Sequence, residues 1–460
     1  MWMPNVNRFT PRKHQALMAA LREEIRSGRL NPGDRLPAQR DLSEAIGVAV
    51  GTIARVYRDA GAEGLIRSTV GRGSYVARRA DAFVTAAGSA PAAAGPIDLR
   101  INQGLSAFDP PLAPALRALA DAGCQDLLTY HDHGGERGHR QAAAGWLKGC
   151  GVERPAERIV LTAGAQNALI LSLAACARPG QAVLTEELTY PGLREAADML
   201  GLDLVPVAMD GQGLDPDALE AALYAHRHAA VLYTSPTIHN PTTTTQPEDR
   251  RRRIAALVAR HGLWIVEDDI HRLYADEAPA PYAALLPERT FFIATLSKVV
   301  CSGLRLAFLA PPEACLRLVL RRILATHWAM SPLSAEIGAR WIRDGTAAAT
   351  LAAKRAEARA RQAIARDILG RHAQPTQGAS LCSWIELGPG WTSDGFVAAA
   401  LGEGVALLGD ASFRPLPDRG RRRGVRLGLG AAADHHALRR ALDATAHLLA
   451  HGPGHPAGVT

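Results

Sequence analysis

One lysine lies between two apolar runs in the stretch FFIATLSKVVCSGLRLAFL, residues 291–309. The runs predict two strands joined by a polar turn that contains glycine. A lysine of a solvated loop is the common alternative. Packed beside apolar strands, however, Lys298 has its charged form disfavoured, which leaves an amine able to attack an aldehyde carbon. Thr295, Ser297 and Arg305 add hydroxyls and charge for a phosphate.

Two further segments carry groups that suit the same ligand. After IVLT, the residues Gly164, Ala165 and Gln166 open an apolar helix, and small residues at a helix start leave backbone donors free for a phosphate. Asp268 ends the run LWIVED, where a carboxylate could hold a ring nitrogen protonated or form a structural cap. An aldehyde, a phosphate and a ring nitrogen together describe pyridoxal 5'-phosphate.

Two more polar residues follow apolar runs. Tyr190, in ELTYPG, could stack on a ring, although an aromatic residue in such a place often belongs to the core. Asn240, in IHNPTTT, could donate to a ring hydroxyl or serve an Asn-Pro turn. Each of these signals is weak when taken alone.

The elements that must position these residues alternate along the chain. Short apolar runs separated by helical stretches indicate a mostly parallel sheet covered by helices on both faces, in which ligands bind at the carboxyl ends of strands. The runs are IVLT at 159, AVLT at 182, DLVPV at 203, AAVLYT at 229, LWIVED at 263, FFIAT at 291 and LRLAFL at 304.

Composition indicates a globular protein of two or three domains. The chain has 460 residues, 47% of them hydrophobic and 21% charged. We find no apolar run long enough to span a bilayer and no signal peptide, so we expect a cytoplasmic protein with no membrane partner. Six scattered cysteines show no C-x-x-C spacing, which predicts neither a metal site nor a disulfide framework.

Charge is concentrated at the amino terminus. Residues 1–79 hold fourteen Lys and Arg against seven Asp and Glu, an excess equal to the net charge of +7 for the whole chain. The asymmetry favours a module that binds a polyanion, with a basic solvated surface as the alternative.

The amino-terminal module reads as helices followed by a hairpin. Residues 14–26 form an amphipathic helix, a second helix follows Pro37, Gly47 ends it, and a third begins near Thr52. Segments 64–67 and 74–76 read as strands of a small wing. Two short helices across a glycine turn make a helix-turn-helix.

Residues 10–77 closely resemble the winged helix of the GntR family of bacterial regulators, through GRLNPGDRLPAQRDLSEAIGVAVGTIARVYRDAGAEGLI and VGRGSYV. The resemblance implies a DNA-binding domain over residues 10–78, followed by an Ala, Gly and Pro-rich linker over 79–96. Ala49 and Val50 stand where relatives have polar or basic residues. The residues at the family's DNA-facing positions are Arg35, Arg40, Gly51, Thr52, Arg55, Gly71 and Arg72.

Residues 97–450 resemble fold type I aminotransferases through YHDHGGERGHR, TAGAQ, TYPG, NPT, EDD, T-x-S-K with G-x-R, and GVRLGLG. The resemblance implies an α/β domain over 97–455 that binds pyridoxal phosphate, with Lys298 as its Schiff-base lysine and Asp268 and Tyr190 beside it as catalytic residues. It also implies that Tyr130 reaches the phosphate of a neighbouring subunit and that Arg426 grips a substrate carboxylate. The implied cofactor-binding residues are Lys298, Gly164, Ala165, Gln166, Tyr190, Asn240, Asp268, His271, Thr295, Ser297, Arg305 and Tyr130.

The sequence departs from this family at two positions. Thr243 stands where relatives commonly have glycine, and His271 stands where many have a tyrosine that donates to the ring oxygen. An imidazole can substitute for that phenol or fail to, which leaves transamination open.

The order of the two domains resembles the MocR/GabR family of transcriptional regulators. It implies a homodimer that binds operator DNA and senses an amino compound or the vitamer itself through pyridoxal phosphate on Lys298. The alternative is a working aminotransferase with an accessory DNA-binding domain. Salt-dependent operator binding favours the first and multiple turnover to a keto acid favours the second.

Overall fold

A computed structural model gives the structure of the chain. It describes residues 13–26, 29–30, 34–62, 65–69, 73–76, 95–374, 376, 378–416 and 423–452. The chain divides into two compact units after residue 90, which falls inside the predicted linker.

The amino-terminal unit contains three helices and a two-stranded antiparallel sheet. They are α1 (Lys13–Arg26), α2 (Gln39–Ile46), α3 (Val50–Ala62), β1 (Ile66–Thr69) and β2 (Gly73–Val76). Leu17, Leu21 and Ile53 are fully buried in one small core, and the Tyr57 hydroxyl donates to the Pro37 carbonyl at 2.9 Å. Gly47 ends α2 with a φ of 62°, a conformation that suits glycine. The predicted helix-turn-helix and wing are therefore present.

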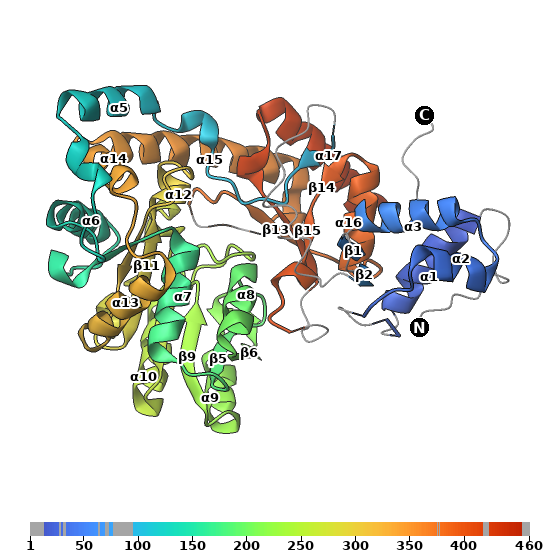
Figure 1. Ribbon diagram of the computed structural model, residues 1–460, viewed down its shortest axis with the longest axis horizontal. Helices are drawn as coiled ribbons and strands as arrows, with labels where there is room; N and C mark the ends of the chain where they lie inside the picture. Colours follow the sequence, from blue (N-terminus) through green and yellow to red (C-terminus); the bar gives the residue numbers. More distant parts are fainter. Residues whose placement is uncertain are drawn as a thin grey trace. The chain divides into compact units, whose positions relative to one another are not determined.

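The centre of the second unit is a seven-stranded sheet (Figure 1). Its order is β4 (Val160–Thr162), β12 (Ala307–Ala310), β11 (Thr290–Thr295), β10 (Trp264–Asp268), β9 (Ala229–Thr234), β5 (Ala182–Glu186) and β6 (Asp203–Val207). Only β12 is antiparallel to its neighbours in this sheet, and the other pairs are parallel. All seven predicted strands exist, and the six parallel ones end at one edge.

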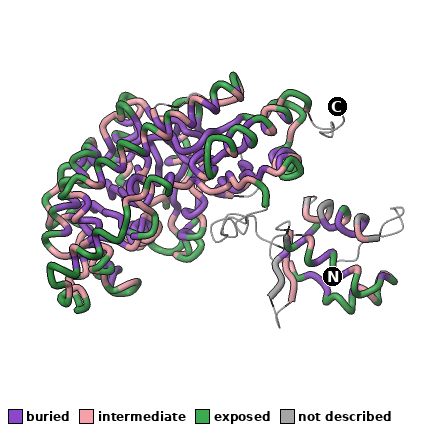
Figure 2. The backbone as a smooth tube through the Cα atoms, turned by 90° about the horizontal axis from the view of Figure 1, so that it is seen from above, coloured by how far each residue is buried: buried purple, intermediate pink, exposed green. Residues whose placement is uncertain are grey.

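Helices cover both faces of this sheet, as the alternation of apolar runs and helices predicts (Figure 1). Along β9, Val231 packs into one core and Leu232 into the other. In Figure 2 the inner segments of this unit are coloured as buried, whereas its outer segments are coloured mostly as exposed or intermediate. The first core includes α7 (Ala165–Cys176), α8 (Pro191–Leu200) and α13 (Glu313–Thr326), and the second includes α9 (Pro216–Ala225), α10 (Glu248–His261) and α11 (Tyr282–Leu285).

A third core packs side chains of β4, β11 and β12 against α6 (Arg137–Gly149), α14 (Pro332–Arg343) and α15 (Thr346–Leu369). The carboxy-terminal part adds an antiparallel sheet in the order β13 (Ser383–Glu386), β16 (Gly424–Leu427) and β15 (Leu408–Gly409). Beside it lie β3 (Ile97–Asp98), which pairs with β14 (Val405–Ala406), and the helices α16 (Ser393–Gly402) and α17 (His435–His451). The remaining elements include α5 (Leu112–Asp121), the 3-10 helices η3 (Gln125–Leu128) and η7 (Asp410–Phe413), and the hairpin β7 (Met209–Asp210) and β8 (Gly213–Leu214).

Several predictions of local structure differ from the structure, and three of the differences affect the argument. Strand β1 begins two residues later than the predicted segment 64–67. Ser297 and Lys298 lie on the one-turn helix α12 (Leu296–Val299), whereas the sequence predicted a turn. The run LRLAFL enters the sheet only at Ala307, because Arg305 has a φ of 50° and a residue in that conformation cannot continue a strand.

Candidate functional site

Three candidate residues of the second unit lie where parallel strands end. Asp268 is the last residue of β10, Lys298 follows β11, and Gly164 follows β4. Their positions at one edge match the place where open parallel sheets bind ligands.

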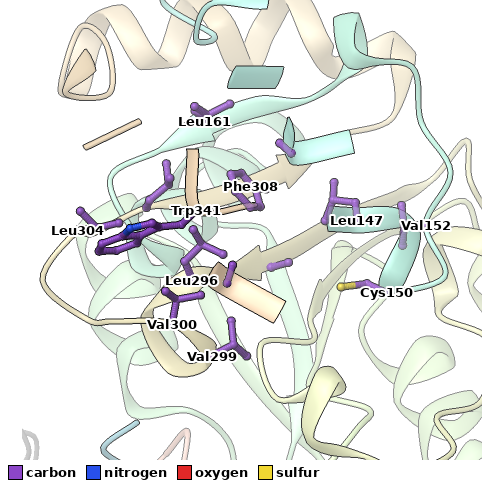
Figure 3. Packing of buried hydrophobic residues seen from close by; sticks show 14 of the residues in the cluster. Leu147, Cys150, Val152, Leu161, Leu296, Val299, Val300, Leu304, Phe308 and Trp341 are labelled. Atoms are coloured by element: carbon purple, nitrogen blue, oxygen red, sulfur yellow. The ribbon is translucent and has the colours of Figure 1, made fainter. Parts of the chain in front are cut away.

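The short helix that carries Lys298 is fixed on both sides. Thr295 caps it by accepting from the Ser297 amide at 3.1 Å. The apolar neighbours Leu296 and Val299 pack into the core together with Phe308 and Trp341 (Figure 3). Packing of its neighbours therefore fixes the backbone of Lys298, and the lysine side chain remains available to the site.

The Lys298 amine is prepared for attack on a carbonyl. Its Nζ donates to the Asn102 carbonyl at 2.5 Å. Burial, together with the positive charges of Arg426 and Arg305, lowers the pKa of Lys298 to about 8. A larger share of the side chain is therefore the neutral amine near neutral pH than in an exposed lysine.

Asp268 holds one oxygen ready for a donor. The Tyr233 hydroxyl donates to Oδ2 at 2.7 Å, whereas the buried Oδ1 has no hydrogen-bond partner among the described residues. Burial raises the pKa of Asp268 to about 6, while Tyr233 and Lys298 oppose this shift. A protonated ring nitrogen would satisfy Oδ1, so the carboxylate fits the pyridine ring of pyridoxal phosphate.

The start of α7 forms a cradle for an anion. Gly164 caps the helix with a φ of 87°, and a Cβ there would lie 2.6 Å from Nη2 of Arg305. The guanidinium thus lies against the glycine at a helix amino terminus, where the first amides lack intrahelical acceptors. Ala165 and Gln166 open the helix. A phosphate fits this combination of charge and backbone donors.

Tyr190 and Gln166 lie together at the start of α8. Tyr190 caps this helix, and Gln166 donates to the Gly192 carbonyl at 2.8 Å. A Cβ on Gly192 would overlap both Gln166 and the Tyr190 ring. Burial and the charge of Asp268 raise the pKa of Tyr190 to about 12, so its hydroxyl stays protonated.

Arg426 and Asn240 form a hydrogen-bonded pair among the candidate residues. Arg426 is 1% exposed and donates through Nη1 to Asn240 Oδ1 at 2.8 Å and through Nη2 to the Arg100 carbonyl. Its Nε has no partner in the described part of the chain, and its guanidinium lies 4.8 Å from the Phe413 ring centroid. Because Asn240 accepts through its oxygen, its amide N–H groups face elsewhere and can donate.

The two departures from the aminotransferase pattern have local explanations. Thr243 has a φ of 60°, a conformation natural to glycine, and its amide donates to the His239 carbonyl at 2.6 Å. His271 is buried, and its Nε2 lies 3.1 Å from Nδ2 of Asn102. Burial and the charges of Lys298 and Arg426 lower the pKa of His271 to about 3, so the ring is neutral.

Tyr130 is, together with Arg305, one of the two exposed cofactor candidates of this unit. It is 91% exposed, and its ring lies 6.2 Å from that of Trp328. The other candidates gather at the edge of the sheet, where the charges of Arg305, Arg426 and Asp268 act on their neighbours.

Sequence reasoning missed Tyr233, Arg100 and Asn102. Tyr233 lies on β9 next to Val266 of β10, and a polar residue near the end of the predicted run AAVLYT could have signalled it. Arg100 and Asn102 follow no strong pattern, because they contribute backbone carbonyls to residues far along the chain.

The DNA-facing candidates lie on the exposed side of the amino-terminal unit. Arg35, Arg40, Gly51 and Arg55 are exposed, and Thr52 is half-buried. Nε of Arg55 lies 3.8 Å from a carboxylate oxygen of Asp59 on the same helix. Arg35 lies beside the wing, since a Cβ on Gly73 would be 3.2 Å from its Nε. Gly71 and Arg72 lie outside the described residues.

Among the described residues, no group of three His, Cys, Asp or Glu could hold a metal ion, and no helix could cross a membrane. All six cysteines are free thiols.

Comparison with known proteins agrees with both halves of the fold. The model for aminotransferase class I and II matches residues 95–444, and the model for the gntR family of bacterial regulatory proteins matches residues 13–76. The kynurenine aminotransferase of Pyrococcus horikoshii superposes with a TM-score of 0.73 at 21% identity, over 80% of this chain and 93% of that one. LysN, the alpha-aminoadipate aminotransferase of Thermus thermophilus, gives 0.70 at 24% identity, over 81% and 98%.

Relatives in sequence cover about two thirds to three quarters of this chain. The uncharacterized HTH-type transcriptional regulator YdeF of Bacillus subtilis is 29% identical over 74% of each chain. The pyridoxine biosynthesis transcriptional regulator PdxR of Corynebacterium glutamicum is 28% identical over 69% of this chain and 71% of its own. The probable rhizopine catabolism regulatory protein MocR of Rhizobium meliloti is 29% identical over 65% of each. The chain belongs to the aminotransferase class I and II family and carries an amino-terminal gntR-type domain, the domain composition of MocR-type regulators.

Proposed function

We propose that the protein is a transcriptional regulator that binds operator DNA through its winged helix and senses an amino compound or the vitamer through pyridoxal phosphate held at Lys298. One observation carries the proposal: a gntR-type domain precedes an aminotransferase-type domain whose lysine, carboxylate and helix start fit pyridoxal phosphate. The regulators YdeF, PdxR and MocR are relatives of the same kind.

The DNA-binding part of the proposal rests on exposed cations. Arg40 lies on α2 and Arg55 on α3, while Arg35 adjoins the wing. In a helix-turn-helix the second helix enters the major groove, so Gly51, Thr52 and Arg55 are assigned to base contacts or to adjacent phosphates. Gly71 and Arg72 of the wing complete the proposed interface.

In the sensing part, each residue has a role that its surroundings suit. The cofactor would supply an aldehyde carbon that condenses reversibly with primary amines. Lys298 would hold it through the deprotonated amine, and Asp268 would pair with its ring nitrogen. The cradle of Gly164 and Arg305, with Ala165, Gln166, Thr295 and Ser297 around it, would hold the phosphate.

Three further residues would orient the ring and the effector. Tyr190 would stack on the ring, and Asn240 would donate to the ring hydroxyl. Arg426, already turned by Asn240 and Arg100, would pair with the carboxylate of an amino acid effector. His271 is assigned to the same ring edge.

The proposal includes a homodimer. A tyrosine that is 91% exposed has no contact in its own chain that explains a role in cofactor binding, but it can complete the site of a second copy. Leu128 is 79% exposed near it, and Leu112 and Leu116 of α5 are exposed as well. Apolar surface of this kind favours association of two aminotransferase domains.

A working aminotransferase is the second candidate. The aminotransferase swnA of Metarhizium robertsii is 34% identical over 46% of this chain, which supports retained chemistry in the second domain. The two candidates make different demands on the amino terminus, because an enzyme does not need the gntR-type domain for turnover.

The experiment that separates them measures DNA binding and turnover on the same preparation. The full-length protein is titrated with the DNA upstream of its own gene at several salt concentrations, and candidate amines with a keto acid acceptor are assayed for product. Specific, salt-dependent binding without sustained turnover supports the regulator. Many turnovers without specific DNA binding would reject it.

A further inference from the structure

The segment that contains Asn102 is clamped from two sides. On one side, the Gly428 amide donates to the Leu99 carbonyl at 2.8 Å. On the other, a Cβ on Gly104 would lie 2.8 Å from the Lys298 carbonyl oxygen, so the two backbones touch. This segment therefore holds its side chains at fixed positions beside the lysine.

Asn102 contacts two residues of the candidate site at once. Its carbonyl accepts from Nζ of Lys298 at 2.5 Å, and its side-chain Nδ2 lies 3.1 Å from Nε2 of His271. Asn102 is 7% exposed and His271 3% exposed. One residue thus ties the reactive amine to the imidazole.

The pairing determines the tautomer of the imidazole. An amide nitrogen only donates, so Nε2 of His271 must accept and a neutral ring carries its proton on Nδ1. The ring is neutral because burial and the charges of Lys298 and Arg426 hold its pKa near 3. The charged and titratable groups that act on this part of the site are Lys298, Arg426, His239, Asp268, Arg305, Tyr190 and Cys382.

The hydrogen bond between Asn102 and His271 leaves other polar groups of Asn102 without a partner inside the protein. Asn102 Oδ1 is buried and makes no hydrogen bond with any described residue, whereas the His271 ring also interacts with the Ile238 backbone. The Asn102 amide has two N–H groups, and His271 occupies one of them. A buried polar atom without a partner costs about 1 to 3 kcal/mol, which a bound ligand can recover.

We propose that Asn102 is a ligand-contacting residue of the Lys298 site and that His271 is the positioning residue that orients its amide. The ligand is a ring with a hydroxyl next to the carbon that the amine attacks, because the oxygen of that group, as a hydroxyl or as an anion, can accept from the free N–H of Asn102. The inference rests on the proposed function in taking this ring to be pyridoxal phosphate. The Asn102–His271 pair then supplies the hydrogen bond for which many aminotransferases use a tyrosine.

A consequence follows for the proton affinity of the loaded site. A donor near the ring oxygen stabilises its anionic form, so removal of the donor favours the protonated state. Loss of one hydrogen bond of ordinary strength corresponds to a rise of about 0.5 to 1 pH unit in the titration midpoint.

The first test follows the visible absorption of pyridoxal phosphate bound to the full-length protein as a function of pH. We expect Asn102→Ala and His271→Phe each to raise the midpoint and the double variant to raise it no further. His271→Gln keeps an acceptor for the amide and should restore the wild-type midpoint. Ser172→Ala removes a buried hydroxyl on α7 whose partner is the Ala168 carbonyl, and it should change nothing. Additive shifts, or no shift in Asn102→Ala, would overturn the proposal.

The second test needs no cofactor and therefore separates this proposal from the proposed function. In protein labelled with 15N-histidine and free of pyridoxal phosphate, the His271 signal is identified by its loss in His271→Phe. We expect a neutral Nδ1–H tautomer that stays unchanged from about pH 5 to about pH 8 and that changes in Asn102→Ala. Titration of His271 in this range, or an identical tautomer in Asn102→Ala, would refute the pairing even if the protein binds the cofactor.

Discussion

Single residues in the site carry costs that only a ligand offsets. Asp268 has one buried oxygen without a described partner, and Arg426 has an equally buried Nε. Both groups lie beside Lys298, whose own charge is disfavoured. Proteins retain such groups where binding requires them, so the same side chains that destabilise the ligand-free domain are those assigned to the ligand.

At Asp268 this cost has a pH dependence. The folded protein raises the pKa of the carboxyl from 3.8 to about 6. Between these values the folded state keeps a proton that the unfolded state has released, so the free energy of unfolding falls as pH rises through this window. In wild type this loss in the free energy of unfolding reaches about 3 kcal/mol, and we expect Asp268→Asn to lack it. Measured by calorimetry without cofactor, the stability of the variant relative to wild type should therefore increase as pH rises. The variant should also bind pyridoxal phosphate more weakly. A variant that is less stable at high pH would contradict the assignment.

At the scale of elements, the sheet brings distant segments to one edge. The glycine at the start of α7 and the arginine before β12 belong to segments over a hundred residues apart, yet they touch because β4 pairs with β12. The short helix α12 depends on packing of Leu296 and Val299 for its position. The cradle therefore depends on the pairing of strands in the sheet, because no single loop contains all of its residues.

A glycine substitution tests the cradle. Gly164→Ala adds a Cβ that must displace the Arg305 guanidinium, whereas Gly180→Ala meets no described atom within 4 Å. The two glycines have similar φ values of 87° and 80°, so Gly180→Ala controls for an alanine at positive φ. We expect both variants to lose about 1 kcal/mol of stability or more, with the larger loss in Gly164→Ala because its ψ of 168° suits glycine alone. Only Gly164→Ala should lose tenfold or more in pyridoxal phosphate affinity by equilibrium dialysis. Equal affinities in the two variants would show that Arg305 plays no part.

A second comparison tests the winged helix as an element. Arg40→Ala and Arg55→Ala remove exposed cations of α2 and α3, and we expect each to weaken operator binding by about 1 to 3 kcal/mol in a fluorescence titration. Arg29→Ala serves as the control, because Arg29 pairs with Glu24 at 2.8 Å away from the candidate positions. Cofactor content should be equal in all three variants. Full operator affinity in both test variants would refute the interface.

The elements of this chain were largely predictable, whereas several contacts were not. Short apolar runs identified every strand of the central sheet, because burial on both faces leaves strands without polar residues. Lys298 and Asp268 could be recognised because they are charged residues at or just after the ends of those runs. Asn102 left no such mark, since its partners lie 196 and 169 residues away and the contacts form only when the chain folds. The start of β12 was misjudged because the conformation of Arg305 has no signature in its residue type.

At the scale of the whole molecule, the proposed sensor depends on two copies. Tyr130 contributes little to its own chain beyond the Trp328 contact, so its assigned role requires a partner. A dimer also presents two winged helices, and paired half-sites then raise specificity.

We expect sedimentation to give a dimer at micromolar concentration, and we expect the sites to be shared. Tyr130→Ala and Lys298→Ala subunits should each bind pyridoxal phosphate poorly alone. In mixed dimers, the subunit that retains Lys298 receives the intact Tyr130 of the other, so about half of the sites should recover, as counted by absorption. No recovery on mixing, or a monomer with full cofactor content, would contradict the shared site.

The most direct measurement is the affinity for operator DNA with and without pyridoxal phosphate and an amine, in wild type and in Lys298→Ala. A ligand shifts an equilibrium only by its differential affinity for two states, and the linkage is reciprocal. We predict that the ligand changes operator affinity in wild type by about 5- to 150-fold, that DNA changes ligand affinity by the same factor, and that Lys298→Ala loses both effects while it keeps salt-dependent DNA binding. Identical operator affinities under every condition, together with sustained keto acid production by wild type, would contradict the regulator and favour the enzyme.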